Sequence, residues 1–141
     1  MTAHFVWTLE YSVGVEAIDE QHRKFFDIAN GILDLVGRGQ ADAGQVPGHI
    51  ARLLEYALYH FSTEEKYFSD FHYPEAELHI AAHDYFRRTV IEYASSFLQP
   101  GHEDYPKMAS QAAQFAGEWL MRHIKGMDQL YVKNFHQHGL K

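Results

Sequence analysis

Seven residues of this 141-residue chain have the side chains and the spacing that a pair of metal ions would require. Each lies near or within an apolar stripe of helical period, where an imidazole or carboxylate needs a partner because burying it unpaired is costly. Side chains four residues apart on a helix are offset by only about 40° and point the same way. The seven residues are His22, His60, Glu64, His79, His83, His123 and Asp128.

The joint pattern is more informative than any one of these residues. A single histidine on an apolar helix face is more often a hydrogen-bonded core residue than a metal ligand. Five imidazoles and two carboxylates on converging faces would be very costly as unpaired groups, and two metal ions would satisfy all of them. The chain has no cysteine, so thiolate ligands are excluded. Imidazole and carboxylate ligands suit iron, and also manganese, cobalt or zinc.

The number of ligands also predicts a reactive position. If both carboxylates and one hydroxide bridge two octahedral ions, the five imidazoles leave one position open, on the ion with fewer histidines. A single open position on a redox-active metal pair, surrounded by apolar side chains, favours the binding of a diatomic gas.

Four amphipathic stretches must bring the seven residues together. Apolar spacing of three and four residues predicts helices over about 19–37, 47–70, 75–98 and 106–135, after an irregular N-terminal arm of residues 1–17. Asp19 is the expected N-cap of the first helix, and Pro47 suits the first turn of the second. Short connections between long helices predict an all-α fold, an antiparallel up-down-up-down four-helix bundle. Residues 1–141 then form a single domain.

His123 and Asp128 have a spacing that a regular helix cannot accommodate within one site. Five residues correspond to about 500° of rotation, so Asp128 would point about 140° away from His123. Gly126 lies between them and would allow the helix to unwind locally. We therefore predict a π-type turn or a kink near Gly126.

Composition and charge exclude several classes of partner. The net charge of −7 argues against nucleic acid, and no apolar run is long enough to span a membrane. The first seven residues lack the basic and apolar regions of a signal peptide. We therefore expect a cytoplasmic protein, and a monomer. Its 11 histidines need an explanation in so acidic a chain.

The motifs around the seven residues resemble those of the hemerythrin family, specifically the single-domain bacterial type. The resemblance extends from Trp7 to about Tyr131 and fills all seven ligand positions in order. It is far more specific than one pair of histidines at helical spacing. The matching motifs are Gln21-His22, the run from His60 to Glu65, Tyr73-Pro74 followed by His79 and His83, and the run from Trp119 to Tyr131.

This resemblance implies two non-haem iron ions joined by a hydroxo or oxo bridge. O2 would bind reversibly at the iron that has two histidine ligands, and nitric oxide or small anions could take the same position. The implied ligands are His79, His83 and His123 on one iron, His22 and His60 on the other, and Glu64 and Asp128 as bridges.

The resemblance also implies an apolar pocket around O2, which would exclude water and slow autoxidation. Taken without the family, each pocket residue would be assigned to core packing. We expect an oxygen carrier, store or sensor and not an enzyme, because ligation by neutral histidines disfavours strong oxygen activation. The alternative is a di-iron enzyme that acts on nitric oxide or peroxide. The implied pocket residues are Phe25, Phe61, Trp119, Leu120 and Ile124.

Overall fold

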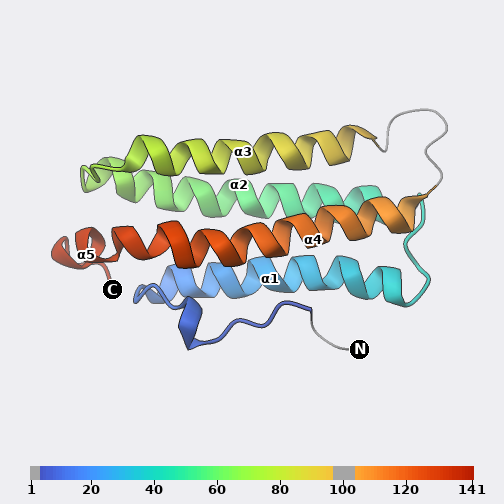
Figure 1. Ribbon diagram of the computed structural model, residues 1–141, viewed down its shortest axis with the longest axis horizontal. Coiled ribbons are helices and arrows are strands. Elements are labelled where there is room, and N and C mark those ends of the chain that lie inside the picture. The colour runs from blue at the N-terminus through green and yellow to red at the C-terminus, as the bar shows by residue number, and fades with distance from the viewer. Residues whose placement is uncertain (1–3, 97–103) are drawn as a thin grey trace.

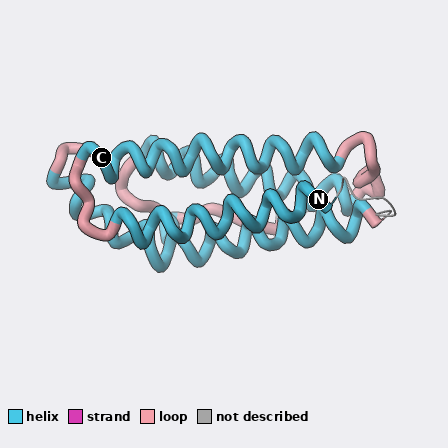
Figure 2. The backbone as a smooth tube through the Cα atoms, turned by 90° about the horizontal axis from the view of Figure 1, so that it is seen from above, coloured by secondary structure: helices cyan, strands magenta, loops and turns pink. Residues whose placement is uncertain are grey.

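The computed structural model describes residues 4–96 and 104–141, which form a bundle of long helices lying side by side (Figure 1). Successive helices run in opposite directions and are joined at the two ends of the bundle, as the perpendicular view also shows (Figure 2). The predicted all-α, up-down-up-down architecture is therefore confirmed. The four long helices are α1 (Glu16–Gly37), α2 (Val46–Asp70), α3 (Ala76–Ser96) and α4 (Tyr105–His123).

The fourth predicted helix is interrupted as its sequence requires. α4 passes into one turn of π-helix at Ile124–Asp128 and then into α5, Gln129–Gln137. The π-type turn predicted near Gly126 is confirmed, although the role given to glycine is not needed. Gly126 has no positive φ, and a Cβ added there would meet nothing within 4 Å. The turn therefore does not depend on the special freedom of glycine.

The first helix begins earlier than predicted, and the reason lies in Asp19. α1 starts at Glu16 with Val15 as its N-cap, so the expected N-cap at Asp19 is wrong. The Asp19 carboxylate instead accepts hydrogen bonds from the Val13 backbone N–H (2.8 Å) and the Ser12 hydroxyl (2.6 Å). Asp19 thus stabilises the loop that precedes the helix. The known preference for aspartate at helix N-caps cannot distinguish this role from that of a true N-cap. The predicted end of the third helix, at 98, lies outside the described residues.

The N-terminal arm packs along the bundle and contains one short 3-10 helix, η1 (Leu9–Tyr11). The Asn30 side chain on α1 holds the arm, because it accepts from the Phe5 N–H (2.9 Å) and donates to the Phe5 carbonyl (2.7 Å). The Phe5 ring lies directly over Gly117 of α4, where a Cβ would come within 2.2 Å of the ring. Glycine is thus required at this crossing so that the arm can approach α4.

The core of the bundle is largely apolar, and most of its buried polar side chains form one cluster toward the end where α2 joins α3. Among the described residues, ten polar or charged side chains are buried, and seven of them are the predicted metal ligands. None of the helices in the described ranges is both long enough and apolar enough to cross a membrane. The fold therefore surrounds one concentration of buried polar groups with hydrophobic side chains.

Candidate metal centre

All four long helices and the π turn send a predicted ligand into the centre of the bundle. The imidazoles and carboxylates are almost entirely shielded from solvent, with His123 the most exposed at 5%. They come from elements distant in sequence, so the fold and not local spacing assembles them. α1 provides His22, α2 provides His60 and Glu64, α3 provides His79 and His83, α4 provides His123, and the π turn provides Asp128.

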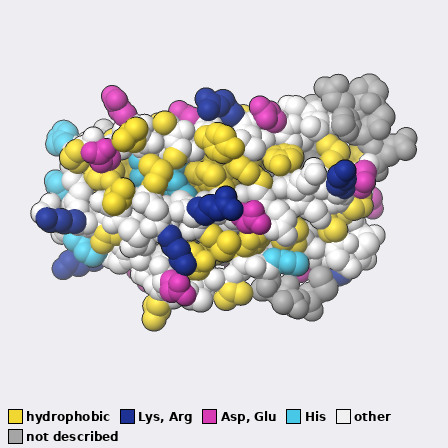
Figure 3. All heavy atoms as spheres, in the orientation of Figure 1, with side chains coloured by type: hydrophobic (Ala, Val, Ile, Leu, Met, Phe, Trp, Pro, Cys, Tyr) yellow, Lys and Arg dark blue, Asp and Glu magenta, His cyan; other side chains and the backbone are white. Residues whose placement is uncertain are grey.

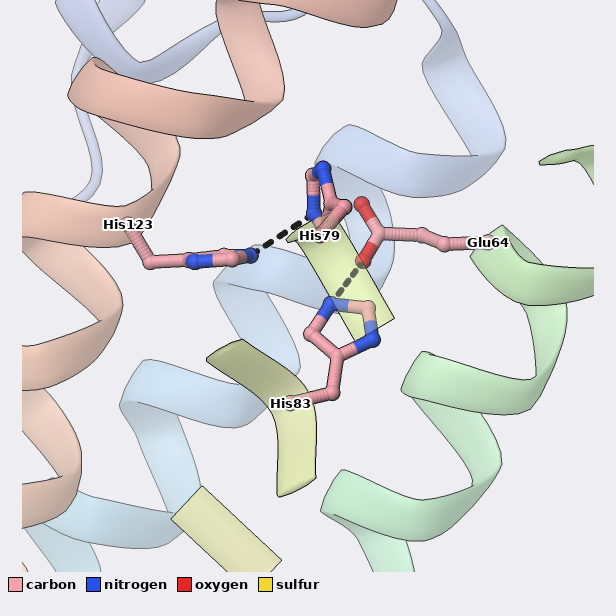
Figure 4. Close-up of side chains that lie close together, drawn as sticks. All are labelled: Glu64, His79, His83 and His123. Atoms are coloured by element: carbon pink, nitrogen blue, oxygen red, sulfur yellow. Dashed lines mark hydrogen bonds and ion pairs between the residues drawn. The ribbon is translucent and has the colours of Figure 1, made fainter. Parts of the chain in front are cut away.

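The ligand atoms fall into two groups that share one carboxylate. In the first group, one ligand atom from each of Glu64, His79, His83 and His123 lies within 4.8 Å of all the others. Figure 4 shows the three imidazoles of this group converging on the Glu64 carboxylate. In the second group, His22 and His60 lie equally close to Glu64. The structure therefore separates the histidines into a set of three and a set of two.

Asp128 connects the same two sets from the π turn. Its Oδ2 lies 3.2 Å from His22 Nε2, while its Oδ1 lies 2.9 Å from His79 Nε2 and 3.1 Å from His123 Nε2. One carboxylate thus faces the pair of histidines with one oxygen and the set of three with the other. This is the arrangement expected of a ligand that bridges two ions.

Glu64, on α2, also contacts both sets of histidines. Its Oε1 lies 3.4 Å from His60 Nε2 and 3.2 Å from His83 Nε2. Its other oxygen, Oε2, accepts a hydrogen bond of 2.5 Å from the buried hydroxyl of Tyr131 on α5. The tyrosine fixes the orientation of a carboxylate that would otherwise be free to rotate.

The atoms that face inward lack hydrogen-bond partners. Both Asp128 oxygens, Glu64 Oε1 and the Nε2 atoms of His22, His60 and His83 are buried and unsatisfied. Each such group costs about 1–3 kcal/mol in the folded protein. Metal ions at the middle of the cluster would satisfy these nitrogen and oxygen donors together, so the residues present fit a metal pair.

The electrostatics of the cluster also suit cations. Burial lowers the pKa of His60 to about 3, so this imidazole is neutral and has a free lone pair. Burial and Asp128 oppose ionisation of Glu64, yet His60 and His83 hold its pKa at about 2. Burial likewise opposes ionisation of Asp128, but the surrounding histidines, His123 first, hold its pKa well below the ordinary value. Both carboxylates are therefore anionic.

Sequence reasoning missed the partners that orient these histidines from outside. His60 Nδ1 lies 2.7 Å from Gln21 Oε1, and His83 Nδ1 lies 2.7 Å from Glu65 Oε2. Because both oxygens can only accept, each Nδ1 carries a proton, and Nε2 is the ring nitrogen that faces the cluster. Gln21 and Glu65 adjoin ligands in the quoted motifs, and that adjacency was the available signal.

Four of the five predicted pocket residues are buried, and the three aromatic ones contact ligand histidines. Phe25, Phe61, Leu120 and Ile124 are at most 1% exposed. The Phe61 ring stacks on His83 at 4.0 Å between centroids. Trp119 stacks on His123 at 4.3 Å, but it lies closer to the surface than the other four.

Trp119 and His123 also reach the outside of the molecule. Both line a surface pocket of about 390 Å³ between α3 and α4. Figure 3 shows histidine side chains among hydrophobic ones on one face of the molecule. His123 itself is 5% exposed, more than any other predicted ligand. The set of three histidines is therefore the part of the cluster nearest to solvent.

Comparison with known proteins identifies the family. The family model described as "Hemerythrin HHE cation binding domain" matches residues 13–134. The chain belongs to the hemerythrin family. This hemerythrin is 32% identical over 130 residues to a bacteriohemerythrin of Clostridium acetobutylicum, covering 91% of this chain and 98% of the relative. It is 31% identical over 131 residues to one of Pseudomonas aeruginosa, covering 92% of this chain and 80% of that protein.

Solved structures agree with this assignment. A crystal structure of wild-type hemerythrin aligns with a TM-score of 0.82 at 26% identity, covering 93% of this chain and 97% of the other. Hemerythrins bind non-haem iron, and this one has histidine and glutamate groups able to hold a metal inside the same fold.

Proposed function

We propose that this hemerythrin binds O2 reversibly at a non-haem di-iron centre and serves as an oxygen carrier, store or sensor. The observation that carries the proposal is the pair of buried carboxylates, Glu64 and Asp128, each of which contacts both sets of histidines. Such carboxylates hold two cations close together, and the division into three and two histidines makes the two cations unequal.

These contacts support one assignment of the ligands to the two ions. Five Nε2 atoms, two bridging carboxylates and one bridging hydroxide would leave one position open on two six-coordinate ions, on the side with two histidines. The ligands would be His79, His83 and His123 on one iron, His22 and His60 on the other, and Glu64 and Asp128 as bridges.

The protein around the centre would make binding reversible. A ferrous pair would supply the electrons with which O2 is held, and every other requirement falls on the surrounding side chains. Phe25, Phe61, Leu120 and Ile124 exclude water and protons, while Trp119 covers the side nearest to solvent. A dry, apolar site of this kind slows irreversible oxidation.

The test is to load the protein with ferrous iron without oxygen, admit air and record the visible spectrum. An absorption band that appears with O2 and disappears on deoxygenation over repeated cycles is the expected result. Metal analysis should give two irons per chain, and a preparation that never holds more than one would contradict the proposal. Asp128→Asn should lose the band, whereas Asp70→Asn on the exposed end of α2 should keep it.

Irreversible oxidation without such a band would instead favour the enzymatic alternative. In that case, catalytic consumption of nitric oxide or peroxide by the loaded protein would identify the reaction. The same Asp128→Asn and Asp70→Asn pair would then show whether turnover depends on the metal centre.

A further inference from the structure

The two sets of histidines are held from outside by acceptors of different charge. In the set of three, His83 donates to a carboxylate, that of Glu65. In the set of two, His60 donates to the neutral amide of Gln21. Both contacts measure 2.7 Å between the donor and acceptor atoms, so they differ in charge and not in length.

The carboxylate partner is part of an ordered ionic network. Arg87 Nη2 donates to the same Glu65 oxygen at 2.7 Å, and Arg87 Nη1 donates to Asp84 at 2.5 Å. Glu65 is only 23% exposed at its side chain, so its charge acts on His83 with little screening by water.

The amide partner is fixed without any charge. Gln21 is 9% exposed and its Nε2 donates to Thr63 Oγ1 at 3.3 Å, while the threonine hydroxyl donates to the Tyr59 carbonyl at 3.1 Å. This chain of hydrogen bonds leaves Gln21 Oε1 directed at His60. A glutamate would fit the same position but would add a negative charge beside the histidine.

We propose that Glu65 and Gln21 are positioning residues that make the two metal positions electronically unequal. This inference rests on the proposed di-iron centre. A histidine that donates to a carboxylate is a more basic ligand than one that donates to an amide. Glu65 therefore makes the position with three histidines the stronger binding site and favours its more highly charged oxidation state. Gln21 leaves the position with two histidines less electron-rich.

Glu65→Gln is the decisive variant because an amide oxygen can still accept from His83. The hydrogen bond is retained and only the charge is lost. In a cobalt(II) titration of the metal-free protein against a competing chelator, we expect one of the two stepwise affinities to fall about tenfold. The reverse change, Gln21→Glu, should raise the other affinity. If the glutamate prevents folding, Gln21→Leu removes the acceptor and should lower that affinity.

The reduction potential is a second measurement. It would not change if Glu65 and Gln21 served only to stabilise the fold. The midpoint potential of the iron-loaded protein should shift to more positive values in Glu65→Gln and to more negative values in Gln21→Glu. Glu55→Gln is the matched control, since it makes the same chemical change at an exposed position on the same helix. It should leave both affinities and potential unchanged.

The outcomes separate this inference from the proposed function. Wild-type protein that takes up fewer than two cobalt ions would contradict the di-metal centre itself. If the wild type binds two ions but Glu65→Gln has unchanged affinities and potential, the inference is wrong and the proposed function stands. Equal shifts in Glu65→Gln and Glu55→Gln would also overturn it, because net charge alone would then explain them.

Discussion

His123 and Asp128 lie five residues apart, yet His123 Nε2 is only 3.1 Å from Asp128 Oδ1. A regular α-helix would place these side chains about 140° apart, and the π turn at Ile124–Asp128 removes that difference. The turn is therefore the local feature that completes the metal centre. It also sets the direction of α5, which brings Tyr131 to Glu64.

Gly126→Ala should be tolerated, because the π turn does not need a glycine. The position is exposed and a Cβ would meet nothing within 4 Å. Alanine should stabilise the protein by about 0.5–1 kcal/mol, since it restricts the unfolded chain. Urea unfolding and metal analysis check this, and loss of a metal ion from Gly126→Ala would show that glycine is required after all.

Inserting one alanine after Gly126 should have the opposite effect. An extra residue turns everything beyond it by about 100°, so Asp128 would leave the centre. We expect the variant to retain helical circular dichroism but to lose the second metal ion. Insertion of an alanine after His138, beyond α5, is the control and should leave metal content unchanged.

Metal binding should stabilise the folded protein strongly. The inward-facing atoms of Asp128 and Glu64 and the Nε2 atoms of three histidines, His22, His60 and His83, have no hydrogen-bond partner in the metal-free protein. A metal ion would relieve their burial cost. A metal at a hundred times its dissociation constant adds about 2.7 kcal/mol per site to the free energy of unfolding. Urea unfolding with zinc(II) and with chelator measures the difference.

Two histidine variants on the same helix, α2, test where the metal binds. His60→Ala should lose most of the metal-dependent stabilisation, because it removes a ligand of the centre. His49→Ala, at a half-buried position near the start of α2, should retain all of it because His49 is not one of the predicted ligands. Equal stabilisation of both variants by zinc would mean that the metal binds elsewhere.

Much of the fold could be predicted from the sequence because helical periodicity and ligand spacing agree. The stripes around His60 with Glu64 and His79 with His83 require helices, and seven buried polar residues require a common location. The π turn that contains Asp128 can also be predicted, because a spacing of five residues from His123 does not fit a regular α-helix. These features depend only on helix geometry and on the cost of burying polar groups.

The features that escaped prediction depend on contacts between distant elements. Asp19 has a good capping side chain, but tertiary packing directs it to Val13 and Ser12. Gln21 and Glu65 have no distinctive spacing, and their roles become visible only when α1, α2 and α3 are in place. Periodicity can show which face of a helix points inward. It cannot show which side chain of a neighbouring helix accepts the hydrogen bond from the Nδ1 atom of a ligand histidine.

Tyr131→Phe should destabilise the metal-free protein by about 1.5–3 kcal/mol. The Tyr131 hydroxyl donates to the anionic Glu64, and its removal leaves a second buried oxygen of that carboxylate without a partner. Burial and the nearby carboxylates raise the pKa of Tyr131 well above its ordinary value, so it remains a donor at any working pH. Urea unfolding in chelator measures the loss. Tyr85→Phe, on the exposed face of α3, should cost almost nothing.

Leu120→Ala should speed autoxidation of the oxygen-loaded protein. Leu120 is fully buried beside Trp119, and the cavity left by alanine would let water approach the centre. The rate at which the O2-dependent band decays measures this. Leu53→Ala makes the same substitution in the core of α2, about 10 Å along the helix from His60. Both variants should lose about 2–5 kcal/mol of stability, so only proximity to the centre distinguishes them. A faster decay in both, or in neither, would show that Leu120 does not protect the site.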